Sequence, residues 1–198
     1  SHTGYIKRMN LNSYRQQRRG GRGITGMTTK EEDFVEQLFI ATTHHYLLVF
    51  TTRGRCFRLK VHEIPEVGRT AKGSALINLL PLSGSEKLQT VIPIKDFDQK
   101  GYLFMATKNG IVKKTPLSDF HSRQNGIIAI NLDDDDDLIG AQFTDGNDDI
   151  IISTAHGMAI RFSEVDVRPM GRVTRGVKGI TLNEGDKVVA LCKAADQS

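Results

Sequence analysis

The chain has 198 residues, of which 38% are hydrophobic, 7% aromatic and 25% charged, and its formal net charge at pH 7 is +4. A chain of this length can bury a core without metal or disulfide support, and its two cysteines, Cys56 and Cys192, form no spaced framework, which favours a reducing compartment. No charged leader precedes an apolar run and no apolar stretch approaches the roughly 20 residues that span a bilayer, so we expect a cytoplasmic protein with no membrane partner.

The first distinctive stretch is a basic, glycine-rich heptapeptide that precedes Glu31, the first acidic residue of the chain. It consists of Gln17, Arg18, Arg19, Gly20, Gly21, Arg22 and Gly23. Glycine is costly in helices and strands, and three arginines cannot be left in a core, so we expect an exposed loop. Unhindered N–H groups and planar guanidinium groups match phosphate oxygens, which indicates a polyanionic partner.

Four segments each place a glycine four positions before a basic residue, and the last three follow a run rich in β-branched and aromatic residues. The glycine segments are 4–8, 54–58, 110–114 and 157–161, and the runs are 46–52, 102–107 and 149–154. Arg-Gly, Asn-Gly and His-Gly at these junctions are typical of tight hairpin turns, which need positive φ. Each repeat unit is therefore predicted to centre on a β-hairpin.

Each hairpin is followed by an apolar pair three residues apart and then by a loop that ends in glycine. The pairs are Leu11 and Tyr14, Val61 and Ile64, and Leu117 and Phe120, whereas the fourth unit has Glu164 and Val167. We align the loop glycines as Gly23, Gly73, Gly126 and Gly179, spaced 50, 53 and 53 residues apart. Further strand-like runs lie at 75–80, 127–132 and 180–182, and closing runs at 34–41, 91–94, 138–143 and 187–191.

A period of about fifty residues that carries four short strands predicts an all-β, propeller-like array of stacked units. We expect one domain over residues 1–198, with repeat units of roughly 1–41, 42–94, 95–143 and 144–194. Stacking places equivalent positions on the same rim, so the basic hairpins and glycine-ended loops should form a belt along one edge. The acidic residues gather on another turn, most densely at 133–137.

The heptapeptide at 17–23 matches the gyrase A box, and flanking segments resemble the same family, the C-terminal DNA-wrapping domain of DNA gyrase A in type IIA topoisomerases. These segments are 4–7, 77–82, 104–107, 109–110 and 183–189. The resemblance covers essentially the whole chain. It implies a β-pinwheel, a propeller variant whose four-stranded blades exchange strands. The family normally has six blades, and we expect this chain to hold about four of them as part of a longer protein.

The resemblance also implies a function, namely sequence-independent binding, bending and wrapping of duplex DNA that directs negative supercoiling by the complete ATP-dependent enzyme. The implied partners are duplex DNA, the remainder of gyrase A, and gyrase B, in the cytoplasm and nucleoid of a bacterium. We expect the isolated domain to be a monomer. ATP and Mg belong to the complete enzyme, with no cofactor or metal expected in this domain. The DNA-cleaving tyrosine of the family lies in another domain, so no catalytic residue is expected here.

If DNA follows the belt, phosphates should contact the heptapeptide and the equivalent loops of the later units. The predicted DNA-binding residues are Gln17, Arg18, Arg19, Gly20, Gly21, Arg22, Gly23, Arg69, Lys72, Arg123, Arg172, Arg175 and Lys178. The loop at 122–126 is the poorest copy, because Asn125 stands at a position that the alignment makes basic elsewhere. No loop carries a base-reading helix, so binding should be independent of sequence and steeply dependent on salt.

Three other functions stay open. One is the C-terminal domain of topoisomerase IV, against which the intact heptapeptide argues. A propeller scaffold for protein partners would bind DNA weakly and without salt sensitivity. A propeller enzyme would need polar groups converging at the axis, and no catalytic arrangement follows from the spacing.

Two candidate metal sites and two arginines also have plainer interpretations. His44 and His45 are adjacent on a predicted strand and so diverge, which disfavours a metal site. The run 133–137 lacks the glycine and terminal glutamate of a calcium loop, so we expect a solvated turn, with repulsion of DNA as a hypothesis. For Arg55 and Arg58, surface solvation and DNA contact are equally compatible with the sequence.

Overall fold

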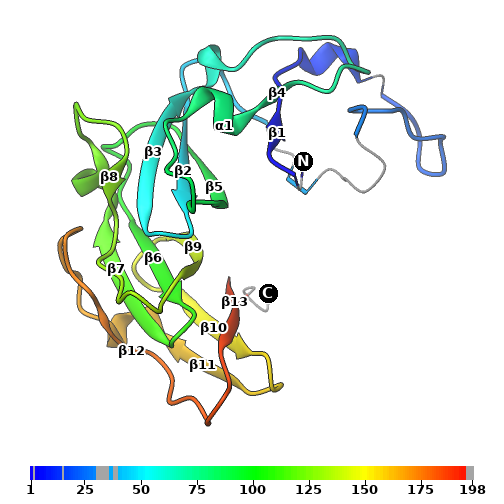
Figure 1. Cartoon of the computed structure of the whole chain (residues 1–198). Coiled ribbons are helices and arrows are strands. Elements are labelled where there is room, and N and C mark those ends of the chain that lie inside the picture. Colours follow the sequence, from blue (N-terminus) through cyan, green and yellow to red (C-terminus); the bar gives the residue numbers. More distant parts are fainter. Residues whose placement is uncertain (2, 15, 30–35, 38–39, 195–198) are drawn as a thin grey trace.

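The protein is an array of antiparallel sheets arranged along an arc (Figure 1). The computed structural model describes residues 1, 3–14, 16–29, 36–37 and 40–194. Within these residues the strands form two four-stranded sheets, one three-stranded sheet and one two-stranded sheet. The predicted all-β class is confirmed, and the few helical elements are single turns between strands.

Each of the three larger sheets is built on a hairpin and a third strand that returns beside its first strand. The hairpins are β2 (Tyr46–Thr51) with β3 (Arg55–Lys60), β6 (Tyr102–Thr107) with β7 (Ile111–Pro116), and β10 (Asp149–Thr154) with β11 (Ala159–Ser163). The third strands are β5 (Leu88–Ile94), β9 (Leu138–Thr144) and β13 (Val188–Lys193). The turn glycines Gly54, Gly110 and Gly157 have φ of 78°, 89° and 82°, which confirms the predicted hairpin turns.

The outer strand of each four-stranded sheet comes from the following repeat unit. Strand β8 (Ile127–Ile128) pairs with β3, and β12 (Val177–Lys178) pairs with β7. In the same way β4 (Ser74–Ala75) pairs with β1 (Tyr5–Ile6) in the two-stranded sheet. Neighbouring units are therefore tied by main-chain hydrogen bonds as well as by packing, which is the strand exchange of a β-pinwheel.

The strand exchange corrects the alignment of the fourth loop. Gly73, Gly126 and Gly176 each have positive φ and each stand immediately before an exchanged strand. The fourth loop therefore ends at Gly176, 50 residues after Gly126, and not at Gly179. The N–H of Gly179 instead donates to the carbonyl of the hairpin-turn glycine Gly110.

The strands predicted after the loop glycines are much shorter than expected. Only two residues pair in each case, and the run predicted at 180–182 forms no strand. The chain then leaves the sheet edge because its next apolar side chains enter the core: Leu76 begins the single-turn helix α1 (Leu76–Leu79), and Ala129 and Ile130 are buried. Burial between the layers thus overrides the strand propensity of these runs.

The apolar pairs after the hairpins form short 3₁₀ turns rather than strands. These turns are η1 (Leu11–Ser13), η2 (Val61–Glu63), η3 (Leu117–Phe120) and η4 (Glu164–Asp166). In η4 the first position is Glu164, which breaks the apolar pattern of the repeat. Its side chain is nevertheless fully buried, as its apolar counterpart Leu117 is, because it is paired with buried donors.

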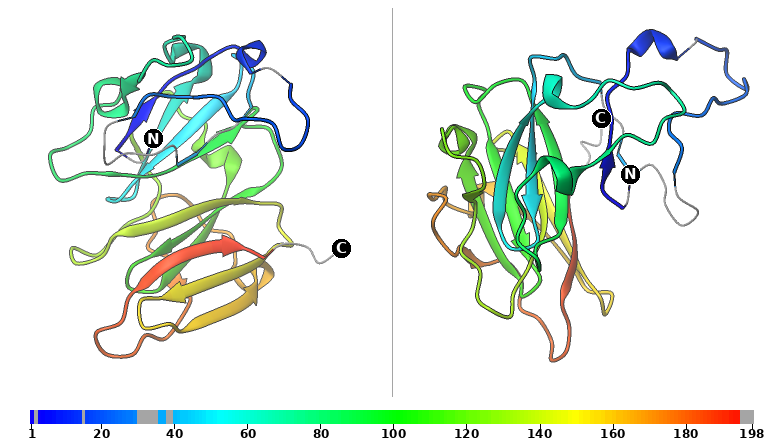
Figure 2. Two further views of the ribbon diagram at one scale, coloured as in Figure 1. Left: turned by 90° about the vertical axis from the view of Figure 1, so that its right-hand side faces the viewer. Right: turned by 45° about the horizontal axis from the view of Figure 1, so that its top comes forward.

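The core lies between successive layers, which Figure 2 shows stacked one above the next. One cluster joins the sheets of β2 and β6 through side chains such as Phe50, Leu103 and Met105, and another joins the sheets of β6 and β10 through Phe104 and Ile152. Strands β5, β9 and β13 contact one another along the inner side of the arc, whereas β8 and β12 form outer edges. The closing run predicted at 34–41 falls largely outside the described residues.

Candidate nucleic-acid interface

The heptapeptide at 17–23 lies in an extended loop that leads away from β1, and all seven residues are exposed. Gly20 has a φ of +90°, and the N–H of Gly21 donates to the carbonyl of Arg18 at 2.9 Å, so the centre of the heptapeptide is a tight turn. The side chains of Arg18, Arg19 and Arg22 have no hydrogen bond or ion pair to any described residue. Three permanently charged groups therefore face solvent on one loop.

The corrected register shows one pattern of charge in three of the four loops. We define the first loop as 17–23, the second as 68–73, the third as 122–126 and the fourth as 171–176. Basic residues stand four positions and one position before the final glycine: Arg19 and Arg22, Arg69 and Lys72, and Arg172 and Arg175. We call these the basic pairs. Figure 1 shows the second, third and fourth loops on the outer side of the arc.

In the second and fourth loops the first arginine of the pair also bonds to the chain just past the preceding loop. Arg69 Nη1 donates to the carbonyl of Thr25 at 3.3 Å, and Arg172 Nη1 donates to the carbonyl of Ile128 at 2.9 Å. Thr25 and Ile128 are each two residues past the final glycine of the preceding loop. The same bond thus recurs at two of the three junctions between loops.

In the second and fourth loops the second member of the pair contacts a side chain. Lys72 Nζ lies 4.3 Å from the ring centroid of Tyr5, which is a cation–π contact. Arg175 Nη2 lies 2.7 Å from Asp133 Oδ2, and both side chains are largely exposed. Such an exposed ion pair contributes about 0.2–1 kcal/mol, so a phosphate can compete for this guanidinium.

The third loop lacks a basic pair, as its sequence suggested. Its two positions hold Ser122 and Asn125, and the amide of Asn125 bonds to the backbone N–H and carbonyl of Arg58. Arg58 Nη1 also donates to the carbonyl of Ser122 at 2.9 Å. Arg123 is exposed and is the one basic residue of this loop. Lys178, predicted to be the counterpart of Asn125, is instead an exposed residue of β12.

The basic residues of the hairpins differ in exposure. Lys114 is buried, with its Nζ 3.6 Å from Glu164 Oε1 and 4.7 Å from the ring centroid of Tyr102. Arg55 is half-buried, with its Nη1 3.5 Å from Glu86 Oε1, and Arg58 is half-buried and bonds to the third loop. Lys60 and Arg161 are exposed, so the hairpins also contribute positive charge to the surface.

The acidic turns are also part of the structure, which the sequence interpretation missed. Glu86, Asp136 and Asp186 each stand at the fourth position of a turn and reach the end of the adjacent hairpin. Glu86 accepts from the buried Thr51 hydroxyl at 2.7 Å. Burial raises the pKa of Asp186, but hydrogen bonds from Thr154 and from backbone N–H groups outweigh it and hold this pKa below its ordinary value.

This finding changes the account of the run 133–137. Asp136 is buried, and its carboxylate accepts the N–H groups of Asn109 and Asp137 at 2.9 Å. Asp137 pairs with Arg53 at 3.0 Å. The prediction of a wholly solvated turn was therefore wrong for Asp136. An acidic residue at the fourth position recurs in the turns at 83–86 and 183–186, which is the signal that could have revealed its structural role.

Two further features are candidates for other chemistry. Within the described residues, Asp145, Asp148 and Glu164 bring carboxylate oxygens within 4.8 Å of one another. These oxygens already accept hydrogen bonds from turn N–H groups and from a buried threonine, so the carboxylate group has a structural role.

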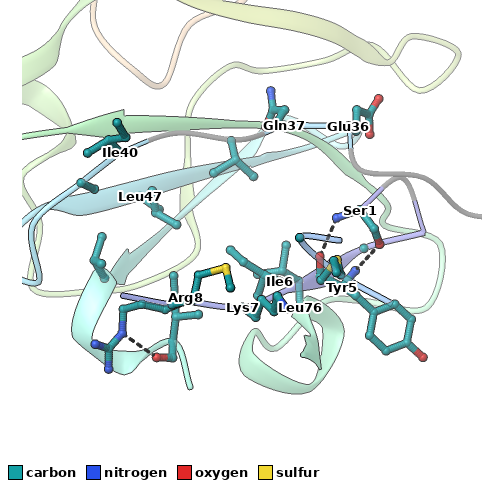
Figure 3. A pocket seen from close by; sticks show the side chains of 18 of the residues that line it. Ser1, Tyr5, Ile6, Lys7, Arg8, Glu36, Gln37, Ile40, Leu47 and Leu76 are labelled. Carbon is teal, nitrogen blue, oxygen red and sulfur yellow. Dashed lines mark hydrogen bonds between the residues drawn. The ribbon is translucent and has the colours of Figure 1, made fainter. Parts of the chain in front are cut away.

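A cavity of about 700 Å³ beside β1 is lined mainly by apolar side chains such as Ile6 and Leu47 (Figure 3). It holds no member of a basic pair.

The comparisons with known proteins agree with this geometry. The family model described as "DNA gyrase C-terminal domain, beta-propeller" matches residues 1–42, 45–95, 101–145 and 148–191. The chain belongs to this family. The first matched segment of the DNA gyrase C-terminal domain family includes the heptapeptide. Within the described residues, no helix is both long and apolar enough to cross a membrane.

Curated relatives of this gyrase-domain chain are A subunits of DNA gyrase. It is 56% identical over 180 residues to that of Clostridium acetobutylicum, 53% identical over 182 residues to that of Halalkalibacterium halodurans, and 48% identical over 193 residues to that of Staphylococcus aureus. These alignments cover 90%, 91% and 96% of the chain. The chain spans 22% of the length of each relative.

Solved structures support the fold. A C-terminal domain of DNA topoisomerase IV superposes with a TM-score of 0.86 at 32% identity, covering 98% of this chain and 59% of that chain. A DNA gyrase A C-terminal domain superposes with a TM-score of 0.69 at 28% identity, covering 96% and 62%. The predicted β-pinwheel of the DNA gyrase C-terminal domain family is thereby confirmed.

Proposed function

We propose that this chain binds duplex DNA along its outer perimeter and bends it, as the C-terminal domain of a DNA gyrase A. The observation that carries the proposal is the recurrence of the basic pairs at the same two positions of the first, second and fourth loops. Family membership supplies the class of ligand. Phosphate is the chemical group that a row of guanidinium and ammonium groups recognises without reading sequence.

Bending requires several loops to act together. Bending a site of 20–30 base pairs costs on the order of 1–6 kcal/mol, which one pair of phosphate contacts does not offset. The inter-loop bonds of Arg69 and Arg172 hold neighbouring loops at a fixed spacing, so their contacts add without further ordering of the loops. The third loop, with Arg123 and no basic pair, should contribute least.

The proposal is tested by the salt dependence of binding to duplexes of unrelated sequence. Each neutralised phosphate contributes about 0.9 to the slope of log K against log salt. Replacing Arg22, Lys72 and Arg175 together by alanine should lower the slope by about 2 to 3 for every duplex. A triple alanine variant at the exposed Lys95, Lys100 and Lys187, which lie outside the four loops, is the control and should change the slope much less. Equal slopes for the two variants would refute the proposal.

At the level of the complete enzyme, we propose that the DNA path set by this domain directs ATP-driven negative supercoiling. The remainder of gyrase A, gyrase B, ATP and Mg are the further components of that reaction, which takes place in the cytoplasm. Replacing Arg18, Arg19 and Arg22 by alanine in full-length gyrase A should abolish supercoiling and leave relaxation of supercoiled DNA. Supercoiling retained at the original rate would contradict the role given to the heptapeptide.

Topoisomerase IV is the second candidate, and its domain gives the larger TM-score of the two structures. The curated relatives at 48–56% identity are nevertheless gyrases, and the heptapeptide is intact. The supercoiling assay separates the two candidates. An enzyme that relaxes or unlinks DNA but never introduces negative supercoils with the unaltered domain would favour the topoisomerase IV assignment.

A further inference from the structure

Two lysines, Lys7 just after β1 and Lys113 in β7, lie beneath two of the loops that carry basic pairs. Lys7 Nζ donates to the carbonyls of Gly68 at 3.0 Å, Arg69 at 2.6 Å and Ala71 at 2.8 Å. All three acceptors belong to the second loop, which is part of the following repeat unit. A single ammonium group thus uses its three donors on three main-chain oxygens of one loop.

Lys113 makes the equivalent arrangement under the fourth loop. Its side chain is fully buried, and its Nζ donates to the carbonyls of Ala129 at 2.6 Å and Thr174 at 3.2 Å and to the carbonyl of Arg172. Lys7 and Lys113 each stand three residues after a glycine with positive φ, Gly4 and Gly110. The acceptors also correspond, because residues 69 and 71 match residues 172 and 174 when Gly73 is aligned with Gly176.

The third loop provides an internal comparison. The residue three positions after its hairpin glycine is Phe57, whose ring lies under Gly126 and offers no hydrogen-bond donor. This loop is also the one without a basic pair, with Ser122 and Asn125 at the two positions. Among the second, third and fourth loops, a lysine lies beneath each loop that has a basic pair, and an aromatic ring lies beneath the loop that lacks one.

We propose that Lys7 and Lys113 are positioning residues that fix the second and fourth loops in the shape that presents their basic pairs to DNA. The inference rests on the proposed DNA-binding function. Each ammonium group satisfies carbonyls that would otherwise turn freely, so the loop is ordered before DNA arrives. It also places a positive charge under the loop, which strengthens the attraction for phosphate.

The charge of Lys113 allows a test that distinguishes its proposed role from simple packing, because an effect of packing alone would not depend on pH. Burial and the neighbouring Arg172 lower the pKa of Lys113 to about 7, and Asp119 opposes this effect. These are the charged groups that face Lys113, since Lys114 points to the opposite face of β7 and meets Glu164. The neutral amine keeps two of the three donors, and the lowered pKa means that the closed site favours it over the ammonium group. The loop should therefore be held better above neutral pH.

The experiment compares Lys113→Met, Lys7→Met and the control Lys95→Met in the 198-residue chain. Hydrogen exchange without DNA is measured on peptides that cover 68–75 and 171–178. Lys113→Met should speed exchange about tenfold in 171–178 only, and Lys7→Met in 68–75 only, because each lysine holds one loop. Lys7 is only half-buried, so its variant keeps the test available if Lys113→Met does not fold.

Binding to a duplex is then measured at pH 6, and loop exchange is repeated from pH 6 to 8.5. Either variant should bind about three- to tenfold more weakly than the unaltered chain at pH 6, and Lys95→Met within about twofold. The difference in 171–178 exchange between the unaltered chain and Lys113→Met should widen as pH rises through 7, after correction for the intrinsic exchange rate. Unchanged loop exchange, or an exchange difference that is the same at every pH, would overturn the positioning role. Failure of the unaltered chain to bind any duplex would instead overturn the proposed function, whatever the exchange result.

Discussion

The buried pair of Glu164 and Lys114 permits a stability prediction that tests how the repeat tolerates a charged residue in an apolar position. Glu164 Oε1 accepts from Thr144 Oγ1 at 3.0 Å and lies 3.6 Å from Lys114 Nζ, while Oε2 accepts the N–H of Asp148 at 2.9 Å. Glu164→Gln removes the charge and turns one acceptor into a donor that faces other donors. Breaking one side of a buried pair costs about 3–5 kcal/mol.

We expect the lower end of that range, about 3 kcal/mol of unfolding free energy, because Lys114 keeps a carbonyl partner and the ring of Tyr102. This corresponds to a fall in Tm of roughly 6–12 °C for a chain of this size. Urea unfolding followed by circular dichroism measures the change. Glu63→Gln, at an exposed position of the equivalent turn η2, is the control and should stay within about 0.5 kcal/mol. A Glu164→Gln variant as stable as the control would refute the reasoning.

Three further predictions concern the fourth loop and its surroundings. Gly176→Ala should cost more than about 2 kcal/mol, because φ is +102° and a new Cβ would lie 2.4 Å from a backbone oxygen of β7, whereas Gly171→Ala opens into free space and should be nearly neutral in the same unfolding assay. The native pKa of Lys113 lies below its ordinary 10.5, so the folded state binds fewer protons and this residue's contribution to stability is lost as pH falls. Between pH 9 and pH 7 the unaltered chain should therefore lose about 2 kcal/mol of unfolding free energy relative to Lys113→Met. If the unfolding free energies of the two proteins changed in parallel with pH, this sign would be contradicted. Asp133→Asn frees the guanidinium of the fourth loop and should tighten duplex binding about two- to fivefold at moderate salt, measured by anisotropy, whereas an equal gain in the exposed Asp134→Asn would show a general charge effect only.

The repeat period and the hairpins could be predicted because their signals are local. A β-branched run, a turn glycine and a strand of similar length recur in the last three units, and the structure places β2–β3, β6–β7 and β10–β11 there. The exchanged strands were misjudged in length and the fourth loop in register, since both depend on pairing with a strand of another unit. Gly179 and Gly176 are only three residues apart, and positive φ at Gly176 decides between them.

The charges of the interface could be predicted only in part. The exposed arginines of the heptapeptide followed from composition, because no folded core accepts three unpaired guanidinium groups. The buried Lys113 and Lys114 could not be recognised, since each is stabilised by partners from a distant segment. The inter-loop bond of Arg172 is likewise invisible until the loops are placed side by side.

The most direct test of the central claim is the distance between the two ends of a labelled duplex of about 40 base pairs when this chain binds its middle. Free DNA of this length is nearly straight, since its persistence length is about 150 base pairs. The account predicts that energy transfer between the ends rises on binding and returns to the free value when salt displaces the protein. A duplex that is fully bound at low salt and shows unchanged transfer would contradict a curved DNA path along the basic loops.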